Sequence, residues 1–402
     1  MNKITVSGVG SCLIDRVYNH ISFTSKSFSS FLSNERGDGG LSPGHLVFKE
    51  EFEKFIKQDF KTALNEITNG KLPSKLNVGG PCIVAMINAA QITENKDCDF
   101  RFYGYGGKNE DGDFLFSSLE KTPVNINNYT LINKDTPSTI VLSDPNYDDG
   151  HGERIFINSI ASAWDYSPNN LDDEFFSSDI VVFGGTALVP QIHDHLTSLL
   201  KKAKNKGCIT IVTTVFDFRN EKANPDIKWP LGENDESYLN IDLLITDFEE
   251  ALRLSGKDCI DDAMKFFRDK GTGALIVTNG PHNVKGFSTQ NSIFQKLDNL
   301  DMPISKAVSE KLKEGHNGDT TGCGDNFAGG VIAGLALQLQ SKQSLIDLTE
   351  AVSWGVISGG YTCFYIGGTY FEKFPGEKYN LLLPYYDKYR EQIKIDNETM
   401  DT

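Results

Sequence analysis

The chain has 402 residues, of which 39% are hydrophobic and 23% are charged, which is an ordinary globular composition. Its formal net charge of −16 argues against nucleic acid or an anionic membrane as a main partner, because either would need a basic face. The seven cysteines are scattered and form no Cys-x-x-Cys pair, which argues against a disulfide framework or a zinc site.

The N-terminal residues MNKITVSGVG predict a strand at 3–9 that enters a glycine turn, without the long apolar region of a signal peptide. No stretch reaches the roughly 20 apolar residues that a membrane-spanning helix needs. We therefore expect a reducing, cytoplasmic location.

The segment that follows predicts a loop and then an amphipathic helix. Residues 22–45 are rich in Ser and Gly and indicate loop with some strand. Across about 48–68, apolar side chains recur at helical spacing opposite a charged face. We expect the phenylalanines of 52–60 to form a packed helix face, although a dimer contact through this region is an open alternative.

The next elements are a buried helix at 82–92 and a strand at 100–104. Residues 139–144 and 153–159 then flank the turn-like segment PNYDDGHG, which predicts a β-hairpin.

From about residue 179 onward, strands and helices alternate regularly. The predicted strands are 180–185, 208–217, 243–247 and 274–280, and the predicted helices between them include 192–207 and 249–256. Such alternation predicts a parallel sheet with helices on both faces. Functional groups should then gather at the carboxyl ends of the strands. The tail at 386–402 is polar, and we expect it to fray.

The most informative stretch is the loop at 319–325, Asp-Thr-Thr-Gly-Cys-Gly-Asp, because an apolar helical pattern begins directly after it. Glycines at 322 and 324 allow successive N–H groups to point at one spot beside the positive end of a helix. That arrangement suits a phosphate. Asp325 then stands where a carboxylate could take a proton from a hydroxyl group that is being phosphorylated. The alternative is a glycine-rich turn that only starts a helix.

This loop resembles the D-T-x-G-A-G-D signature of the PfkB (ribokinase-like) family of carbohydrate and nucleoside kinases, with Cys323 in the place of Ala. The resemblance extends from residue 3 to about 375. It implies an α/β class with a three-layer α/β/α fold, a central mostly parallel sheet and a small β lid. The implied kinase domain spans 1–385, with lid elements from about 15–47 and 137–160. By resemblance, Gly322, Cys323 and Gly324 form the anion hole, and Asp325 is the catalytic base.

Weaker matches follow in the family's order. They assign substrate binding to Asp15, Gly79, Gly80, Asn109 and Arg219. They assign nucleotide binding to Thr278, Gly280, Asp247 and Thr320, and a Mg²⁺-placing role to Glu250. The turn Gly152-Glu153-Arg154 matches a G-E-R turn in the lid. The resemblance thus implies ATP and Mg²⁺ as cofactors, and it leaves a monovalent cation open.

Three positions depart from the family pattern on the side that faces the substrate or the nucleotide. Val84 replaces an Asn, Asn109 replaces an Asp, and Asp247 replaces the Asn of N-x-x-E. The implied function is ATP-dependent phosphorylation of a hydroxyl group, most simply a primary CH₂OH, of a sugar. A nucleoside kinase is the alternative, and its base could pack on aromatic residues such as Phe28, Phe31, Tyr103, Tyr105 and Trp164. A catalytically silent sugar-binding protein is a third hypothesis.

Several of these residues also have a purely structural interpretation. Asp15 could be a turn residue, and Glu250 could be a solvated acid in a first helical turn. For Asp247 we favour a helix cap over a ligand. Cys323 could carry a lowered pKa beside a helix N-terminus, although a small residue in an Ala-sized space is the simpler interpretation.

Overall fold

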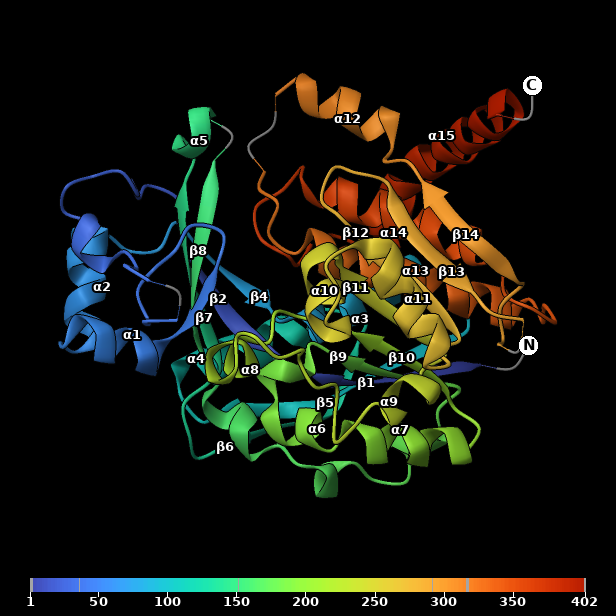
Figure 1. Cartoon of the computed structure of the whole chain (residues 1–402), viewed down its shortest axis with the longest axis horizontal. Coiled ribbons are helices and arrows are strands. Elements are labelled where there is room, and N and C mark those ends of the chain that lie inside the picture. Colours follow the sequence, from blue (N-terminus) through green and yellow to red (C-terminus); the bar gives the residue numbers. More distant parts are fainter. Residues whose placement is uncertain (1–2, 36, 151, 291, 316–317, 401–402) are drawn as a thin grey trace.

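The computed structural model describes residues 3–35, 37–150, 152–290, 292–315 and 318–400. Its main feature is a nine-stranded sheet of order β14-β13-β12-β11-β10-β9-β1-β5-β6 (Figure 1). From β6 to β12 neighbouring strands are parallel, and β13 and β14 add an antiparallel edge. The strands are β1 (Ile4–Gly10), β5 (Cys98–Gly107), β6 (Asn125–Ile132), β9 (Ile180–Gly184), β10 (Ile209–Thr213), β11 (Leu243–Asp247), β12 (Ala274–Thr278), β13 (Val284–Ser288) and β14 (Leu297–Met302).

Helices cover both faces of this sheet, so the predicted three-layer α/β/α class is confirmed. One apolar core holds α3 (Pro81–Ile92), α13 (Cys323–Gln340), α14 (Leu348–Thr362) and residues of α12 (Lys306–Lys313). The other holds α7 (Leu196–Asn205), α10 (Phe248–Ser255) and α11 (Ile260–Asp269). The central strands read as continuous apolar runs because both of their faces are buried.

A further group of helices is shorter or lies at the rim of the main sheet. They are α4 (Glu110–Leu119), α5 (Tyr147–Gly150), α6 (Pro190–Asp194), α8 (Phe218–Ala223) and α9 (Glu236–Leu239). The helix predicted at 192–207 is therefore two helices, which divide at His195. Among the described residues, no helix is long and apolar enough to cross a membrane.

A second, five-stranded sheet of order β3-β8-β7-β2-β4 forms the lid, which stands apart from the main sheet in Figure 1. Its strands are β2 (Leu13–Tyr18), β3 (Leu46–Phe48), β4 (Lys75–Gly79), β7 (Ser138–Asp144) and β8 (Glu153–Ser159). The predicted hairpin is confirmed by the antiparallel pairing of β7 with β8. The lid also contains β4, which lies outside the predicted lid segments.

The helix predicted at about 48–68 is wrong in one respect, because it is two helices, α1 (Lys49–Ile56) and α2 (Phe60–Thr68). Lys57 adopts a left-handed φ of 55° and ends the first helix. Asp59 caps the second helix by accepting from two backbone N–H groups. Phe52 is fully buried in the apolar core of this insertion, so the aromatic stripe is a packed helix face.

The expectation that the tail at 386–402 frays is wrong as far as Met400, because helix α15 spans Glu377–Met400; residues 401–402 lie outside the described ranges. Tyr389 is fully buried, and its hydroxyl donates to the Pro303 carbonyl at 2.6 Å. Tyr386 stacks on Trp354 of α14 with ring centroids 4.1 Å apart. These aromatic side chains dock a helix whose polar residues alone predict a frayed end.

Candidate active site

The loop at 319–325, which we call the catalytic loop after its expected role, leads into the N-terminus of α13. Its two glycines have opposite surroundings. Gly322 caps the helix with a left-handed φ of 76°, and a Cβ there would overlap the Cα of Gly368. A Cβ on Gly324 would meet open space. The side chain of Asp319 holds the loop by accepting from the N–H groups of Thr321 at 2.9 Å and Gly367 at 3.2 Å. The first amides of α13 therefore border an open space that has room for an anionic group.

Asp325 lies in the first turn of α13 and is half-buried. Burial raises the pKa of its carboxyl group to about 6. At neutral pH this group is mostly ionised, and it is a stronger base than an ordinary Asp. Its position and pKa both suit proton acceptance from a hydroxyl group.

Asp15 lies on β2 of the lid, within reach of the charges of Asp319 and Asp325. A Cβ on Gly79 of the neighbouring strand would overlap this carboxyl group, so the glycine makes room for it. The pKa of Asp15 is raised to about 8, first by burial and then by the charges of Asp325 and Asp319. Asp15 is therefore a buried residue inside a strand, and the alternative of a turn residue is wrong.

A row of polar side chains crosses the lid sheet at the level of Asp15. In register, Asn77 on β4 pairs with Asp15, Asp15 with Thr139 on β7, and Thr139 with Asn158 on β8. All four residues are buried, and the Asn158 amide donates to the Thr139 hydroxyl at 2.9 Å. Directly paired residues share a face of a sheet, so the row faces the same way as Asp15.

Asn77 stands out in this row because, among the described residues, neither its side-chain nitrogen nor its oxygen has a hydrogen-bond partner. A buried amide without partners costs free energy unless something else satisfies it. Gly367 allows the amide to approach closely, because a Cβ there would overlap the Asn77 nitrogen. Sequence reasoning missed Asn77, Thr139 and Asn158, and only their register with Asp15 identifies them.

Glu250 and Asp247 begin helix α10 with a reciprocal capping box. The Glu250 N–H donates to Asp247 at 2.8 Å, which confirms the cap interpretation of Asp247. Glu250 is buried and accepts from the Thr214 hydroxyl, so the alternative of a solvated acid is wrong. Burial raises its pKa to about 8, with further contributions from Asp247 and Asp325. The charge of Asp325 therefore acts on Glu250 as well as on Asp15.

The described residues contain no cluster of three or more metal-ligating side chains. One or two carboxylates suffice for a Mg²⁺ ion that keeps several waters, so a buried carboxyl group such as Glu250 is compatible with it, and its metal role stays a prediction.

The predicted nucleotide-side residues lie near the ends of two neighbouring strands and at the start of the catalytic loop. Thr278 ends β12 and pairs in register with Asp247 at the end of β11. Gly280 follows with a left-handed φ of 51°, and a Cβ there would meet open space. Thr320 is exposed. Open backbone at the carboxyl ends of parallel strands leaves room for a ligand.

Arg154 belongs to the G-E-R turn of the lid, and the sequence assigns no separate role to it. Its guanidinium donates to the Thr321 hydroxyl at 3.0 Å and lies 5.5 Å from the centre of the Phe156 ring. Strand β8 of the lid thereby contacts the catalytic loop directly, through a cation that could also face an anion.

Two predicted substrate residues have structural partners instead. Asn109 caps α4 by accepting from the Gly112 N–H at 3.0 Å, and its oxygen also accepts from the Thr136 hydroxyl at 2.6 Å. Arg219 forms a two-pronged ion pair with Asp194. Neither described contact reaches the catalytic loop, and substrate binding by these two residues stays a prediction.

The interpretation of Cys323 as a thiol of lowered pKa is wrong. The pKa of Cys323 is raised, first by its hydrogen bond with Cys363 and then by burial. Its small side chain fits the place that an alanine fills in the resembling motif.

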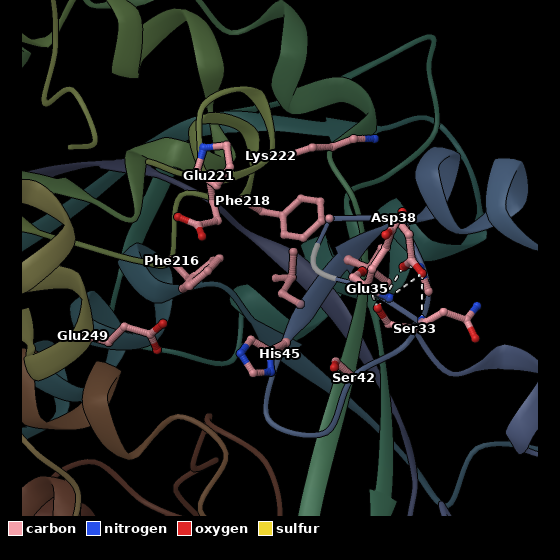
Figure 2. Close-up of a pocket in the computed structure, with 17 residues that line it drawn as sticks. Ser33, Glu35, Asp38, Ser42, His45, Phe216, Phe218, Glu221, Lys222 and Glu249 are labelled. Carbon is pink, nitrogen blue, oxygen red and sulfur yellow. Dashed lines mark hydrogen bonds between the residues drawn. The ribbon is translucent and has the colours of Figure 1, made fainter. Parts of the chain in front are cut away.

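A cleft of about 530 Å³ opens between residues 33–35 and 37–47 on the lid side and the start of α8 (Figure 2). Phe216, Phe218 and His45 line it together with Glu249, the neighbour of Glu250. The His45 and Phe216 rings stand edge to face, 6.5 Å apart. These side chains offer flat apolar surface beside acidic groups.

The aromatic residues first considered for a nucleoside base lie elsewhere. Phe28 and Phe31 are buried in the core of the insertion, and Tyr103, on β5 of the main sheet, is buried in the core on one face of that sheet. Tyr105 stacks edge to face on Tyr166, and the exposed Trp164 lines a separate hollow.

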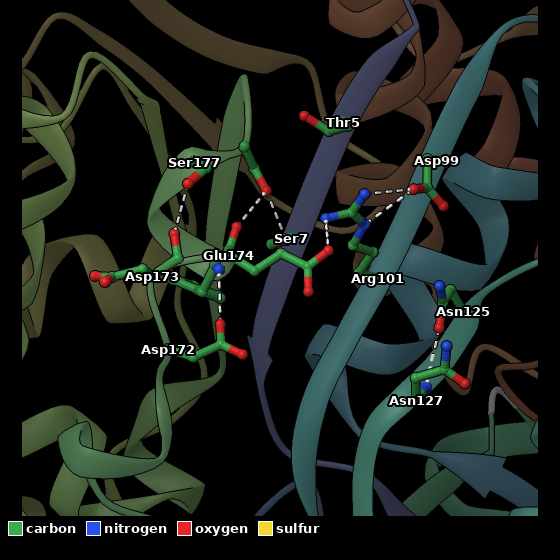
Figure 3. A network of polar contacts seen from close by, with 12 residues as sticks. Thr5, Ser7, Asp99, Arg101, Asn125, Asn127, Asp172, Asp173, Glu174 and Ser177 are labelled. Atoms are coloured by element: carbon green, nitrogen blue, oxygen red, sulfur yellow. Dashed lines mark hydrogen bonds and ion pairs between the residues drawn. The ribbon is translucent and has the colours of Figure 1, made fainter.

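An acidic cluster near Arg101 is structural (Figure 3). The Arg101 guanidinium donates to Asp99 at 2.9 Å and to Glu174 at 2.7 Å. Asp172 accepts from the Phe175 N–H at 3.0 Å. These carboxylates have protein donors and join β5 to the segment before β9.

Comparison with known proteins places the chain among kinases. The sequence profile described as "pfkB family carbohydrate kinase" matches residues 75–354, well over half of the chain. The fold is similar to that of ribokinase from Thermotoga maritima, with a TM-score of 0.60 and 18% identity over 95% of this chain and 99% of that chain. It is also similar to adenosine kinase from Sinorhizobium meliloti (TM-score 0.67, 15% identity, 95% and 99% covered). A third similar structure is adenosine kinase from Schistosoma mansoni in complex with 2-fluoroadenosine (TM-score 0.67, 16% identity, 91% and 97% covered).

Proposed function

Because this chain belongs to the pfkB family of carbohydrate kinases, we propose that it transfers the γ-phosphoryl group of ATP to a primary CH₂OH of a sugar or sugar derivative. The observation that carries the proposal is that the lid packs on the loop that leads to Asp325. Asn77, the strand partner of the buried Asp15, lies against Gly367, whose N–H donates to Asp319, and the charge of Asp325 acts on Asp15. The Asp325 carboxyl group is then available for the reacting hydroxyl group, and the Asp15 carboxyl group is available for neighbouring hydroxyl groups of the acceptor.

The separated pKa values of these two carboxyl groups support distinct roles. With a pKa of about 6, Asp325 is mostly ionised at neutral pH and can accept the hydroxyl proton. With a pKa of about 8, Asp15 is mostly protonated and can donate a hydrogen bond as well as accept one. Asp15 therefore positions hydroxyl groups without competing for the proton.

The N-terminus of α13 would stabilise charge that develops on the transferred group. The helix dipole and the amides at 322–324 would face a group bound in the space left open by Gly324, although the Cys323 N–H donates to the Thr320 carbonyl at 3.3 Å. Arg154 holds Thr321 beside this space and brings positive charge from the lid. ATP would lie toward Thr278 and Gly280, and Mg²⁺, near Glu250, would neutralise phosphate charge.

The polar row on the lid supports a polyhydroxylated acceptor. Asp15 and Thr139 offer hydrogen-bonding groups on one face, and Asn77 lacks a partner in the protein. Hydroxyl groups of a sugar could satisfy such a row, whereas an apolar acceptor would leave it buried and unpaired.

A nucleoside kinase is the second candidate, and the cleft beside the lid favours it. Phe216 and His45 would offer edges and faces for a base, while the polar row would hold the ribose. A silent sugar-binding protein is less well supported, because Asp325 and the open space at Gly324 are both retained.

The test is a coupled ADP-release assay with ATP–Mg²⁺ across a panel of sugars and nucleosides. We expect at least one acceptor to raise ADP release, and Asp325→Asn to lower kcat by about 10²-fold or more through loss of the base. Asp59→Asn is a matched control, because Asp59 caps the distant helix α2 and Asn is also a good cap. Near-normal turnover by Asp325→Asn would refute the assignment of the base. No response to any acceptor would favour the silent binder.

A further inference from the structure

Two cysteines meet beside the catalytic loop. The sulfur of Cys323, the first residue of α13, lies 3.5 Å from the sulfur of Cys363, just after α14. Both residues are half-buried. A disulfide bond needs an S–S distance of about 2.05 Å, so a relative movement of about 1.5 Å would join them.

The two segments that carry these cysteines are packed backbone to backbone. Gly318 lies against the Cys363 carbonyl, where a Cβ would overlap that oxygen. The Asp319 N–H donates to the Tyr365 carbonyl at 3.2 Å, and Gly322 lies against Gly368 in the same way. Such packing holds the two sulfur atoms together and leaves little room for the loop to absorb a displacement.

The surroundings favour reaction at Cys363. Its hydrogen bond with Cys323 lowers the pKa of the Cys363 thiol against the opposing effects of burial and of Asp319, and the positive charge of Arg154 also lowers this pKa. A thiolate is the nucleophile in oxidation by peroxides, and reactivity follows thiolate character and access.

We propose that Cys323 and Cys363 form a reversible disulfide bond that is a redox modification site of the catalytic loop, with a peroxide as the oxidant. The Cys363 thiolate attacks one peroxide oxygen, which gives a sulfenic acid and releases water once the leaving oxygen is protonated. The Cys323 sulfur then attacks the sulfenic sulfur, and its proton leaves with the hydroxyl group as a second water. Two thiols and one hydrogen peroxide thus yield one disulfide and two waters. The sulfurs lose two electrons, and the peroxide oxygens gain them.

The consequence for catalysis rests on the proposed function. Cys323 lies between the two glycines of the anion hole, so a shift of its side chain moves the amides that border the open space at Gly324. A misplacement of about 1 Å can cost about 100-fold in rate. Oxidation would therefore lower kcat, and a dithiol would restore it.

The experiment treats the full chain with hydrogen peroxide and follows two signals, linkage and ADP release. Peptide mapping without reductant should show a peptide from 323 joined to one from 363. A thiol titration should find two fewer thiols than the seven of the reduced chain. ADP release should fall by about 10- to 100-fold and return with dithiothreitol.

Cys363→Ser should keep its basal turnover and resist the peroxide. Cys259→Ser is the matched control, because Cys259 is exposed and distant in sequence, and this variant should remain as sensitive as the wild type. The absence of a 323–363 peptide would overturn the site, and equal inactivation of Cys363→Ser would overturn its role. If the reduced protein turns over no acceptor, the proposed function fails while the linked peptide still establishes the disulfide.

Discussion

The two glycines of the catalytic loop should respond to alanine in opposite ways. In Gly322→Ala the new methyl group takes a left-handed φ of 76° and overlaps Gly368. In Gly324→Ala the methyl group enters open space, where we place the transferred phosphoryl group. The first variant should therefore lose stability, and the second should lose turnover.

The magnitudes follow from these surroundings. A left-handed alanine costs about 1–2 kcal/mol, so Gly322→Ala should lose at least that much free energy of unfolding. Gly324 lies in the first turn of a helix, where alanine is favoured by up to about 1 kcal/mol. Gly324→Ala should therefore be as stable as the wild type or slightly more stable. A methyl group between the phosphate and its amide donors should lower kcat by about 10²-fold, the usual cost of one lost donor.

Urea unfolding followed by circular dichroism gives the free energy of unfolding, and coupled ADP release gives kcat. Gly207→Ala is the control for backbone strain alone, because Gly207 has a φ of 86° and a Cβ there meets nothing. Gly322→Ala should lose more stability than Gly207→Ala does, by the cost of the overlap. The reasoning fails if Gly324→Ala keeps near-normal kcat, or if it is the less stable of the two loop variants.

Three further predictions concern the lid and the buried acids. Asn77→Ala should leave the free protein about as stable, because it removes an unpaired amide, yet raise the acceptor KM by about 5- to 100-fold; an unchanged KM would remove Asn77 from the site. Arg154→Ala should lower kcat/KM by about tenfold, with partial recovery in Arg154→Lys, while the surface variant Arg268→Ala stays normal; equal values for all three would contradict a lid-to-loop contact. The raised pKa of Asp15 means that the folded state binds the proton more tightly than the unfolded state. Its contribution to stability is complete below about pH 4 and is lost as pH rises through about 8. Asp15→Asn should therefore gain stability over the wild type from pH 6 to 9 and match it at low pH, and parallel curves in pH-dependent urea unfolding would refute the shift.

The sequence predicts the parts of this molecule that are local. The loop at 319–325 contains its glycines, its proposed base and the start of its helix within a few residues. The strands from 180 onward are recognisable in the sequence as short apolar runs. Helix α15 is the contrary case. Its polar residues predict a frayed end, but Tyr386 and Tyr389 dock it on distant partners that the local composition does not reveal.

The acceptor side depends on pairing between strands far apart in the chain. Asn77, Thr139 and Asn158 join Asp15 only because β4, β7 and β8 take a particular register. A slip of one residue would turn each of them to the other face. Arg154 is similar, because its partner Thr321 lies 167 residues away. Conversely, Asn109 occupies a family position in which it replaces an Asp, and its oxygen accepts hydrogen bonds from the Gly112 N–H and the Thr136 hydroxyl.

Positions 84 and 77 bear on which acceptor the site would bind, because an amide side chain is present at 77 and not at 84. Val84, where the resembling family has Asn, is buried beside Gly368 and therefore near the catalytic loop. Asn77, beside the adjoining Gly367, presents an amide without a partner. An apolar side chain at 84 cannot hold a hydroxyl group, whereas the Asn77 amide can both donate and accept. If the amide has moved from helix α3 to strand β4, the acceptor is held from the lid. Val84→Asn should then fail to rescue Asn77→Ala, and full rescue of the acceptor KM would show instead that the two positions are interchangeable.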